Sequence, residues 1–156
     1  MYVDFVLDGV TYENTLLEDS RINQGDLAGD FEHHPQVFAR WATLYEMSLD
    51  YVERLKRGNE RDYARLDHLV RMDGKASSVK LTEKMVENTV ITHPDYLESL
   101  NNYLGAKLTS GLLKAARDAM IHRRDMLIQL GATHRAEGVS DISIRDRENT
   151  YKRNNE

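Results

Sequence analysis

The chain of 156 residues contains no cysteine, which excludes disulfide bonds, thiolate metal ligands and cysteine nucleophiles. It has only two prolines, Pro35 and Pro94, so long stretches lack the residue that most often interrupts a helix. No window approaches the roughly 18 consecutive apolar residues that a membrane-spanning helix needs. Residues 1–4 have neither the basic nor the apolar region of a secretory signal. We therefore expect a cytoplasmic protein without a membrane anchor.

Sequence motifs of catalysis are also missing. The chain has no Gly-rich phosphate loop, no G-x-S-x-G or H-E-x-x-H pattern and no EF-hand loop. His33 and His34 follow Glu32, but neighbouring side chains on an arm point in different directions, so we interpret them as a solvated pair. The other histidines lack the spacing of metal ligands. We expect no enzymatic activity, no metal site and no cofactor.

The net charge of −5 is distributed unevenly. Residues 1–34 carry eight acidic side chains and a single basic one, Arg21, whereas residues 105–137 carry six bases and three acids. We expect residues 1–34 to form an acidic, largely flexible arm. Asp8-Gly9 could turn a hairpin within it, although an isolated hairpin is marginal in water. A basic helical segment after an acidic arm is a mild indication of an anionic partner.

A first long helix is expected to begin near Pro35, because proline suits the first helical position. Apolar residues then recur in steps of four and three, which is typical of a helix that packs against another helix. The apolar face resumes in phase after Gly58, which favours one continuous helix that ends at Asp73-Gly74. The expected apolar seam consists of Val37, Trp41, Leu44, Ser48, Tyr51 and Leu55.

A second long helix is expected over residues 94–130, with Pro94-Asp95 at its start and Gly131 after its end. Thr82 should cap a short helix before it. Residues 138–156 show no periodicity and are expected to be a disordered tail. The fold class is therefore all-α, a hairpin-like body of long amphipathic helices over residues 35–137. A helix this long should bury its stripe in a homo-oligomer, and that stripe is Leu97, Leu100, Leu104, Leu108, Gly111, Ala115, Ala119, Met126 and Leu130.

Arginines gather on one face of the first helix. At about 100° per residue they fall opposite the apolar residues. Guanidinium groups match the geometry of phosphate, so this face is a candidate nucleic-acid site, and a merely solvated face is the alternative. Tyr63 could add a base-stacking surface or pack in the core. The candidate residues on this helix are Arg54, Arg57, Arg61, Arg65 and Arg71.

A second basic stripe is expected on the last helix, within about 100° of arc. Repeated cations along one face are what phosphate binding requires, because each neutralised phosphate releases counterions. No groove-reading motif accompanies either stripe, so sequence-specific readout is not expected. The stripe consists of Lys107, Lys114, Arg117 and Arg124, and Arg123 extends it loosely.

Several short segments occur in an order that resembles the phage UvsY family of recombination mediator proteins. The similarity covers roughly residues 21–137, and no single motif within it is decisive. The family's Lys-Ala-Arg-Leu element stands here as Tyr63-Ala64-Arg65-Leu66, so the lysine is missing and only Arg65 carries over. The segments are Phe38-Ala39-Arg40-Trp41, Ala64-Arg65-Leu66-Asp67, Leu81 to Val86, His93-Pro94-Asp95-Tyr96, Arg124-Asp125-Met126-Leu127 and Leu130-Gly131-Ala132.

The resemblance implies a ring-like homo-oligomer that binds single-stranded DNA. It further implies a role in loading a RecA-like recombinase onto DNA coated by single-strand-binding protein, in the cytoplasm of a phage-infected or prophage-carrying bacterium. Arg61, one turn before Arg65, could replace the missing lysine. The alternative hypothesis is a structural or scaffolding helical oligomer that does not bind DNA.

Overall fold

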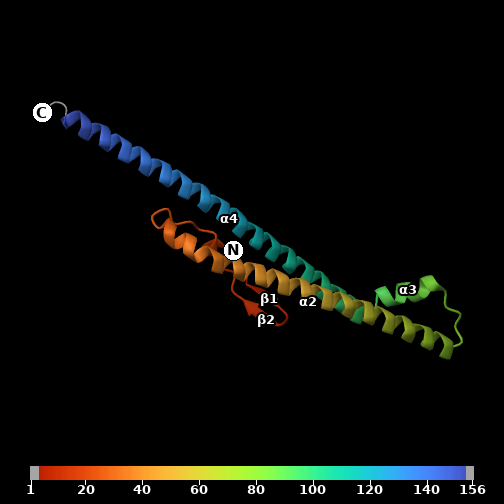
Figure 1. Cartoon of the computed structure of the whole chain (residues 1–156). Coiled ribbons are helices and arrows are strands. Elements are labelled where there is room, and N and C mark those ends of the chain that lie inside the picture. The colour runs from red at the N-terminus through yellow and green to blue at the C-terminus, as the bar shows by residue number, and fades with distance from the viewer. Residues whose placement is uncertain (1–3, 154–156) are drawn as a thin grey trace.

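The computed structural model describes the backbone of residues 4–153 and the side chains of residues 4–138. Two long helices, α2 (Leu27–Ala76) and α4 (Pro94–Arg153), run antiparallel and pack along each other (Figure 1). The short helix α3 (Glu83–Ile91) lies at the turn between them. The N-terminal segment adds strands β1 (Phe5–Leu7) and β2 (Val10–Tyr12) and the single turn α1 (Leu16–Asp19). The expected all-α body of paired long helices is confirmed, with a small antiparallel hairpin beside it.

Helix α2 begins at Leu27, well before the expected start at Pro35. Asp26 caps it, since its carboxylate accepts a hydrogen bond from the backbone N–H of Gly29. Pro35 therefore lies inside the helix, where it costs one backbone hydrogen bond. The helix continues through Gly58, as the phase of the apolar residues indicates.

The expected end of α2 at Asp73-Gly74 is also wrong, because the helix extends to Ala76. Gly74 is buried within the last turns, and a Cβ at this position would overlap the side chain of Leu81. The absence of a side chain at Gly74 therefore allows Leu81, in the segment after α2, to pack closely against the helix. A glycine can have that role inside a helix without ending it.

Helices α3 and α4 begin where the sequence predicts. Thr82 accepts a hydrogen bond from the backbone N–H of Met85, and Pro94 opens α4. The expected end at Gly131 is wrong, since α4 continues to Arg153. Of the glycines in the described part of the chain, only Gly9 has a positive φ, so Gly131 does not adopt the conformation that terminates helices. The tail expected from residue 138 is thus helical to Arg153, and residues 154–156 lie outside the described residues.

The core consists of two apolar clusters at opposite ends of the paired segment. In the first, Trp41 and Leu44 of α2 pack against Leu113 and Met120 of α4. In the second, Leu66 of α2 packs against two valines of α3, Val86 and Val90. The seam predicted for α2 is confirmed, because Val37, Trp41, Leu44 and Ser48 are all buried.

Polar and small side chains occupy the middle of the seam between these clusters. The Ser48 hydroxyl lies 2.9 Å from that of Ser110 on α4. The side-chain oxygen of Asn59 is buried without a hydrogen-bond partner in the described structure. Apolar packing is therefore sparser in the middle of the seam than in the two clusters.

The face of α4 that packs against α2 is not the predicted stripe. The buried residues are Ala106, Ser110, Leu113, Ala116, Met120 and Leu127. Leu104 and Leu108, which belong to the predicted stripe, are 49% and 68% exposed. Helix α4 thus has two apolar faces, and α2 covers only one of them.

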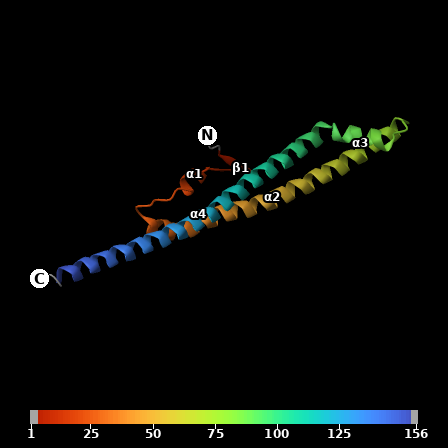
Figure 2. The ribbon, with the colours of Figure 1, turned by 90° about the horizontal axis from the view of Figure 1, so that it is seen from above.

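The flexible arm expected over residues 1–34 is wrong for its described part, because residues 4–26 fold onto the long helices and residues 27–34 belong to α2. Leu7 is buried, and Phe5 stacks on Tyr12 beside Trp41. The indole N–H of Trp41 donates to Asp19 at 2.9 Å. The acidic arm has a surface to bind because α2 and α4 present basic and aromatic groups to it. Figure 2 shows it beside the two helices, and shows α4 extending beyond the start of α2. No helix within the described range is apolar enough to cross a membrane.

Candidate nucleic-acid interface

Three of the predicted arginines, Arg54, Arg57 and Arg61, share the outer face of α2. Their spacing of three and four residues aligns them along one side of a helix, and that side lies opposite the seam with α4. Together with Glu60 they line an open groove of about 610 Å³. All three side chains are exposed, so the groove is accessible to a large anionic ligand.

The three arginines differ in their partners. Arg54 donates to Asp8 at 2.6 Å and to Asp50 at 3.0 Å, and its hydrogen bond to Asp8 is the main reason why the pKa of Arg54 is raised. Arg61 donates only to the backbone carbonyl of Arg57, at 3.3 Å. Among the described side chains, neither Arg57 nor Arg61 forms an ion pair. Two guanidinium groups in the groove are therefore available to phosphate, and the third is already engaged.

Arg65 and Arg71 do not join this groove. Arg65 lies 3.7 Å from Asp62 and 3.4 Å from Asp95 at the start of α4. Arg71 pairs with Asp67 at 2.8 Å and with Glu83 at 2.6 Å, which ties the end of α2 to α3. These hydrogen bonds raise the pKa of Arg71 and lower the pKa values of both carboxylates. Both arginines thus have structural partners, and the Arg65 expected from the family resemblance is among them.

The four cations predicted on α4 do not form one stripe. Lys107 and Lys114 are exposed and form no ion pair within the described residues. Arg117 turns toward α2, where its guanidinium stacks 4.7 Å from the ring of Tyr45 and pairs with Asp118 at 2.8 Å. Arg124 pairs with the adjacent Asp125 at 2.8 Å. Only the two lysines are open to a ligand.

Tyr63, considered as a stacking surface for bases, is part of the second apolar cluster. Its ring packs edge to face against Tyr96, with 5.7 Å between the centroids. Tyr51 is the aromatic residue beside the groove, because the Arg54 guanidinium lies 5.5 Å from the centre of its ring. The sequence pattern places Tyr51 only in the apolar seam of α2. In the structure its side chain is half-buried.

Arg123 was expected to extend the basic stripe, but its side chain is only 4% exposed. It donates to Asp30 at 2.5 Å and to the backbone carbonyl of Arg21 at 3.0 Å, and its guanidinium lies 3.2 Å from Nδ1 of His34. This buried cluster joins α4 to the start of α2. His34 is buried, so the expected solvated histidine pair is wrong for that residue. Burial, together with the charge of Arg123, lowers the pKa of His34.

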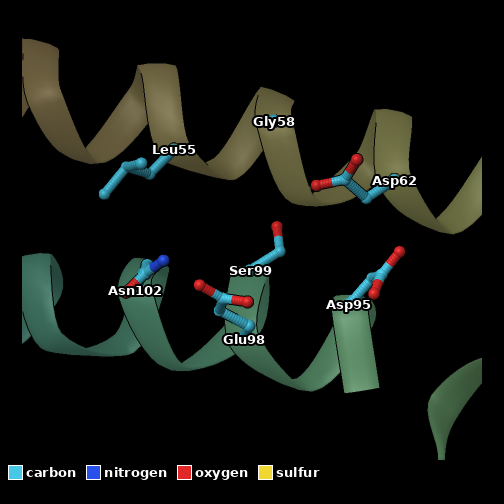
Figure 3. Close-up of a pocket in the computed structure, with 7 residues that line it drawn as sticks. All are labelled: Leu55, Gly58, Asp62, Asp95, Glu98, Ser99 and Asn102. Atoms are coloured by element: carbon cyan, nitrogen blue, oxygen red, sulfur yellow. The ribbon is translucent and has the colours of Figure 1, made fainter. Parts of the chain in front are cut away.

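An acidic groove of about 310 Å³ lies between α2 and α4, away from the arginine groove. Figure 3 shows Asp62 of α2 and Asp95 and Glu98 of α4 around it, together with Leu55, Gly58, Ser99 and Asn102. Carboxylates on both sides of this groove repel phosphate. This groove is therefore an unfavourable place for an anionic ligand.

Within the part of the chain whose side chains are described, no cluster of three or more His, Asp or Glu residues could hold a metal ion. No family model, curated protein or solved structure matches this chain.

Proposed function

We propose that this protein is a recombination mediator that binds single-stranded DNA as a homo-oligomer and is not an enzyme. The observation that carries the proposal is the open groove lined by Arg54, Arg57 and Arg61 on the face of α2 that points away from the core. The RecA-like recombinase and the single-strand-binding protein, as partners, rest on the resemblance to the UvsY family.

The groove supports binding to a phosphate backbone of any sequence. Planar guanidinium groups bind phosphate through two parallel hydrogen bonds. Among the described residues, no carboxylate forms an ion pair with Arg57 or Arg61, so phosphate need not displace one. Tyr51, next to Arg54, adds an aromatic group on which a base can stack. One subunit offers few contacts, so binding by a single chain would be weak.

Assembly provides the gain in affinity that one groove lacks. When copies of a weak site are joined, later contacts form at the high effective concentration set by the first. A strand held by several grooves would be bent or wrapped, which loosens the competing coat protein and presents the DNA to the recombinase. This role requires positioning and charge rather than catalysis.

A structural scaffold is the second candidate, and the exposed apolar face of α4 favours it, since that face needs a partner whether or not DNA binds. In a scaffold, the arginines of α2 would be solvated surface residues. DNA binding therefore separates the two functions.

The test is the double substitution Arg57→Ala and Arg61→Ala, measured by fluorescence anisotropy of labelled single strands at several salt concentrations. Alanine is a better helix former than arginine and both side chains are exposed, so the fold should persist, as circular dichroism would show. We expect weaker binding to all sequences and a log–log salt slope smaller by about 0.7 per lost contact.

Lys56→Ala with Lys84→Ala is the matched control, because it removes two exposed cations that do not line the groove. An equal loss of binding in both double variants would reveal a general charge effect instead of a site in the groove. Unchanged affinity and slope in both double variants, or no binding by the wild-type chain, would favour the scaffold.

A further inference from the structure

Helix α4 carries a largely apolar face, interrupted by Asn101 and His122, that α2 does not cover. Taken at about 100° per residue, its members fall within about 80° of arc, and the centre of this arc lies more than 100° from the centre of the face that packs on α2. Leu108 and Leu112, at the centre, are 68% and 62% exposed. The face consists of Leu97, Leu104, Leu108, Leu112, Ala115 and Met126.

Small residues make a close approach to this face possible. Gly105 and Gly111 lie at its two edges, and a Cβ at either position would meet nothing within 4 Å. Each glycine costs about 1 kcal/mol of helix propensity relative to alanine, so nothing inside one chain accounts for their use. A helix that packs closely on the leucines from outside accounts for both glycines.

The two flanks of the face differ in charge. On one flank are Lys107 and Lys114, which have no ion-pair partner among the described residues. On the other is the N-terminal arm, whose Phe5, Asn14 and Leu16 form an apolar pocket with Leu112 and Ala115. The arm belongs to the segment with eight acids and one base, and its exposed Asp4 accepts a hydrogen bond of 3.1 Å from the backbone N–H of Asn14 at this pocket. The face is therefore bordered by a basic edge and an acidic edge.

We infer that this face binds the same face of a second copy of the chain, with the two α4 helices parallel and in register. In a two-fold pair of parallel helices, each flank meets the opposite flank of the partner. The lysine edge of each copy then lies beside the acidic arm of the other copy, so this contact occurs twice in the pair. In an antiparallel pair, each flank would meet the same flank of the partner. The lysines would then face lysines, and the arm would face the other arm.

The lengths of the helices favour the same orientation. Helix α4 extends to Arg153, well beyond the start of α2, which contacts α4 where Phe31 approaches Gly131. Figures 1 and 2 show this segment projecting alone. A parallel pair brings the two projecting segments together over their whole length, whereas an antiparallel pair places them at opposite ends. Because isolated helices are marginal in water, the parallel pair is the more stable arrangement.

The first test is sedimentation of the full chain with Leu104→Asp and Leu108→Asp. Both side chains are exposed in one chain, so the variant should stay helical, but each copy would bury two charges in the proposed contact. We expect the wild-type chain to sediment as a multiple of one subunit and the variant to dissociate. Leu69→Asp with Met72→Asp, two comparably exposed residues of α2, is the control and should leave the assembly intact. A wild-type chain that is monomeric at micromolar concentration would overturn the proposal.

The orientation can be tested with single cysteines, since the chain has none. Leu108→Cys and Met126→Cys, made separately, lie about 27 Å apart along α4. In a parallel pair each cysteine faces its own copy, so both variants should form disulfide-linked dimers on mild oxidation. An antiparallel pair can cross-link at only one of the two positions, and that result, or no cross-link at either, would refute the arrangement.

This inference deepens the proposed homo-oligomer without requiring DNA binding. An assembly that cross-links at both positions but fails to bind single strands would disprove the proposed function alone.

Discussion

Asp8, at the tip of the N-terminal hairpin, accepts a hydrogen bond of 2.6 Å from the guanidinium of Arg54, in the middle of α2. Asp8 and Gly9 both have positive φ, at 51° and 77°, and this tight turn projects the carboxylate toward the helix. The hairpin is docked through Phe5 and the buried Leu7, so Asp8 stays near Arg54. A phosphate that binds the full arginine groove must displace a carboxylate from one of its three cations.

Asp8→Asn should therefore strengthen binding to single-stranded DNA. The pair is exposed and screened by solvent, so its contribution is small and the gain should be at most about five-fold per site at low salt. Anisotropy titrations would measure it. Glu18→Gln removes the same charge from an exposed arm position that has no ion pair among the described residues. An equal gain from both substitutions would reveal a general charge effect instead of competition at Arg54.

Two glycines of α2 should respond in opposite ways to alanine. Gly58→Ala should raise the free energy of unfolding by about 0.5–1 kcal/mol, because alanine favours helix and a Cβ there meets no atom within 4 Å. Gly74→Ala should lower it by about 1–3 kcal/mol, because the new methyl group would overlap Leu81. Urea denaturation followed by circular dichroism gives both values. Equal stabilisation by the two alanines would mean that the chain after α2 does not approach Gly74 this closely.

Arg123→Met should be among the most damaging single substitutions in the chain. It leaves Asp30 partly buried without its cation, and breaking a buried pair costs about 3–5 kcal/mol. The start of α2 and the arm should become sensitive to protease first, because Arg123 also holds the carbonyl of Arg21. Arg124→Met, next to it and exposed, should change the unfolding free energy little. Similar losses from both variants would contradict the buried cluster.

His34 should make stability depend on pH below neutrality. Its pKa in the folded chain is lower than the ordinary value of 6.5, because burial and the charges of Arg123 and Arg124 disfavour the protonated ring. As the pH falls below 6.5, the unfolded chain takes up a proton that the folded chain resists, so the free energy of unfolding decreases. Above that pH the contribution is constant. Urea denaturation from pH 7.5 to 5 should show a shallower decline in His34→Gln, and parallel curves for both proteins would exclude this role.

The periodicity of the sequence was sufficient to predict the paired long helices, and it failed where one helix has two apolar faces. On α2 a single face is apolar, so Val37, Trp41 and Leu44 were assigned correctly. On α4 the leucines at 104 and 108 and the buried Leu113 and Met120 follow the same period on different faces. A single sequence does not indicate which of two apolar faces packs against the other long helix of the same chain. The structure assigns the less leucine-rich face to α2.

Within the candidate site, the spacing of Arg54, Arg57 and Arg61 was enough to place them on one face, because helical geometry alone determines it. Their electrostatic partners could not be predicted, since Asp8 and Asp95 reach Arg54 and Arg65 from distant parts of the chain. Arg123 was misassigned for the same reason. Its role depends on Asp30 and His34, which approach it only once α2 and α4 have paired.

The serine pair and the unpartnered Asn59 in the middle of the seam have a mechanical consequence. One apolar cluster joins α2 to α4 and the other joins α2 to α3, and the stretch between them has little apolar packing of its own. Backbone amides near Ser48 and Asn59 should accordingly exchange with deuterium sooner than those beside Trp41 or Leu66. If copies of the chain assemble as proposed, this stretch is where we expect the two helices to change their curvature without unpacking either cluster.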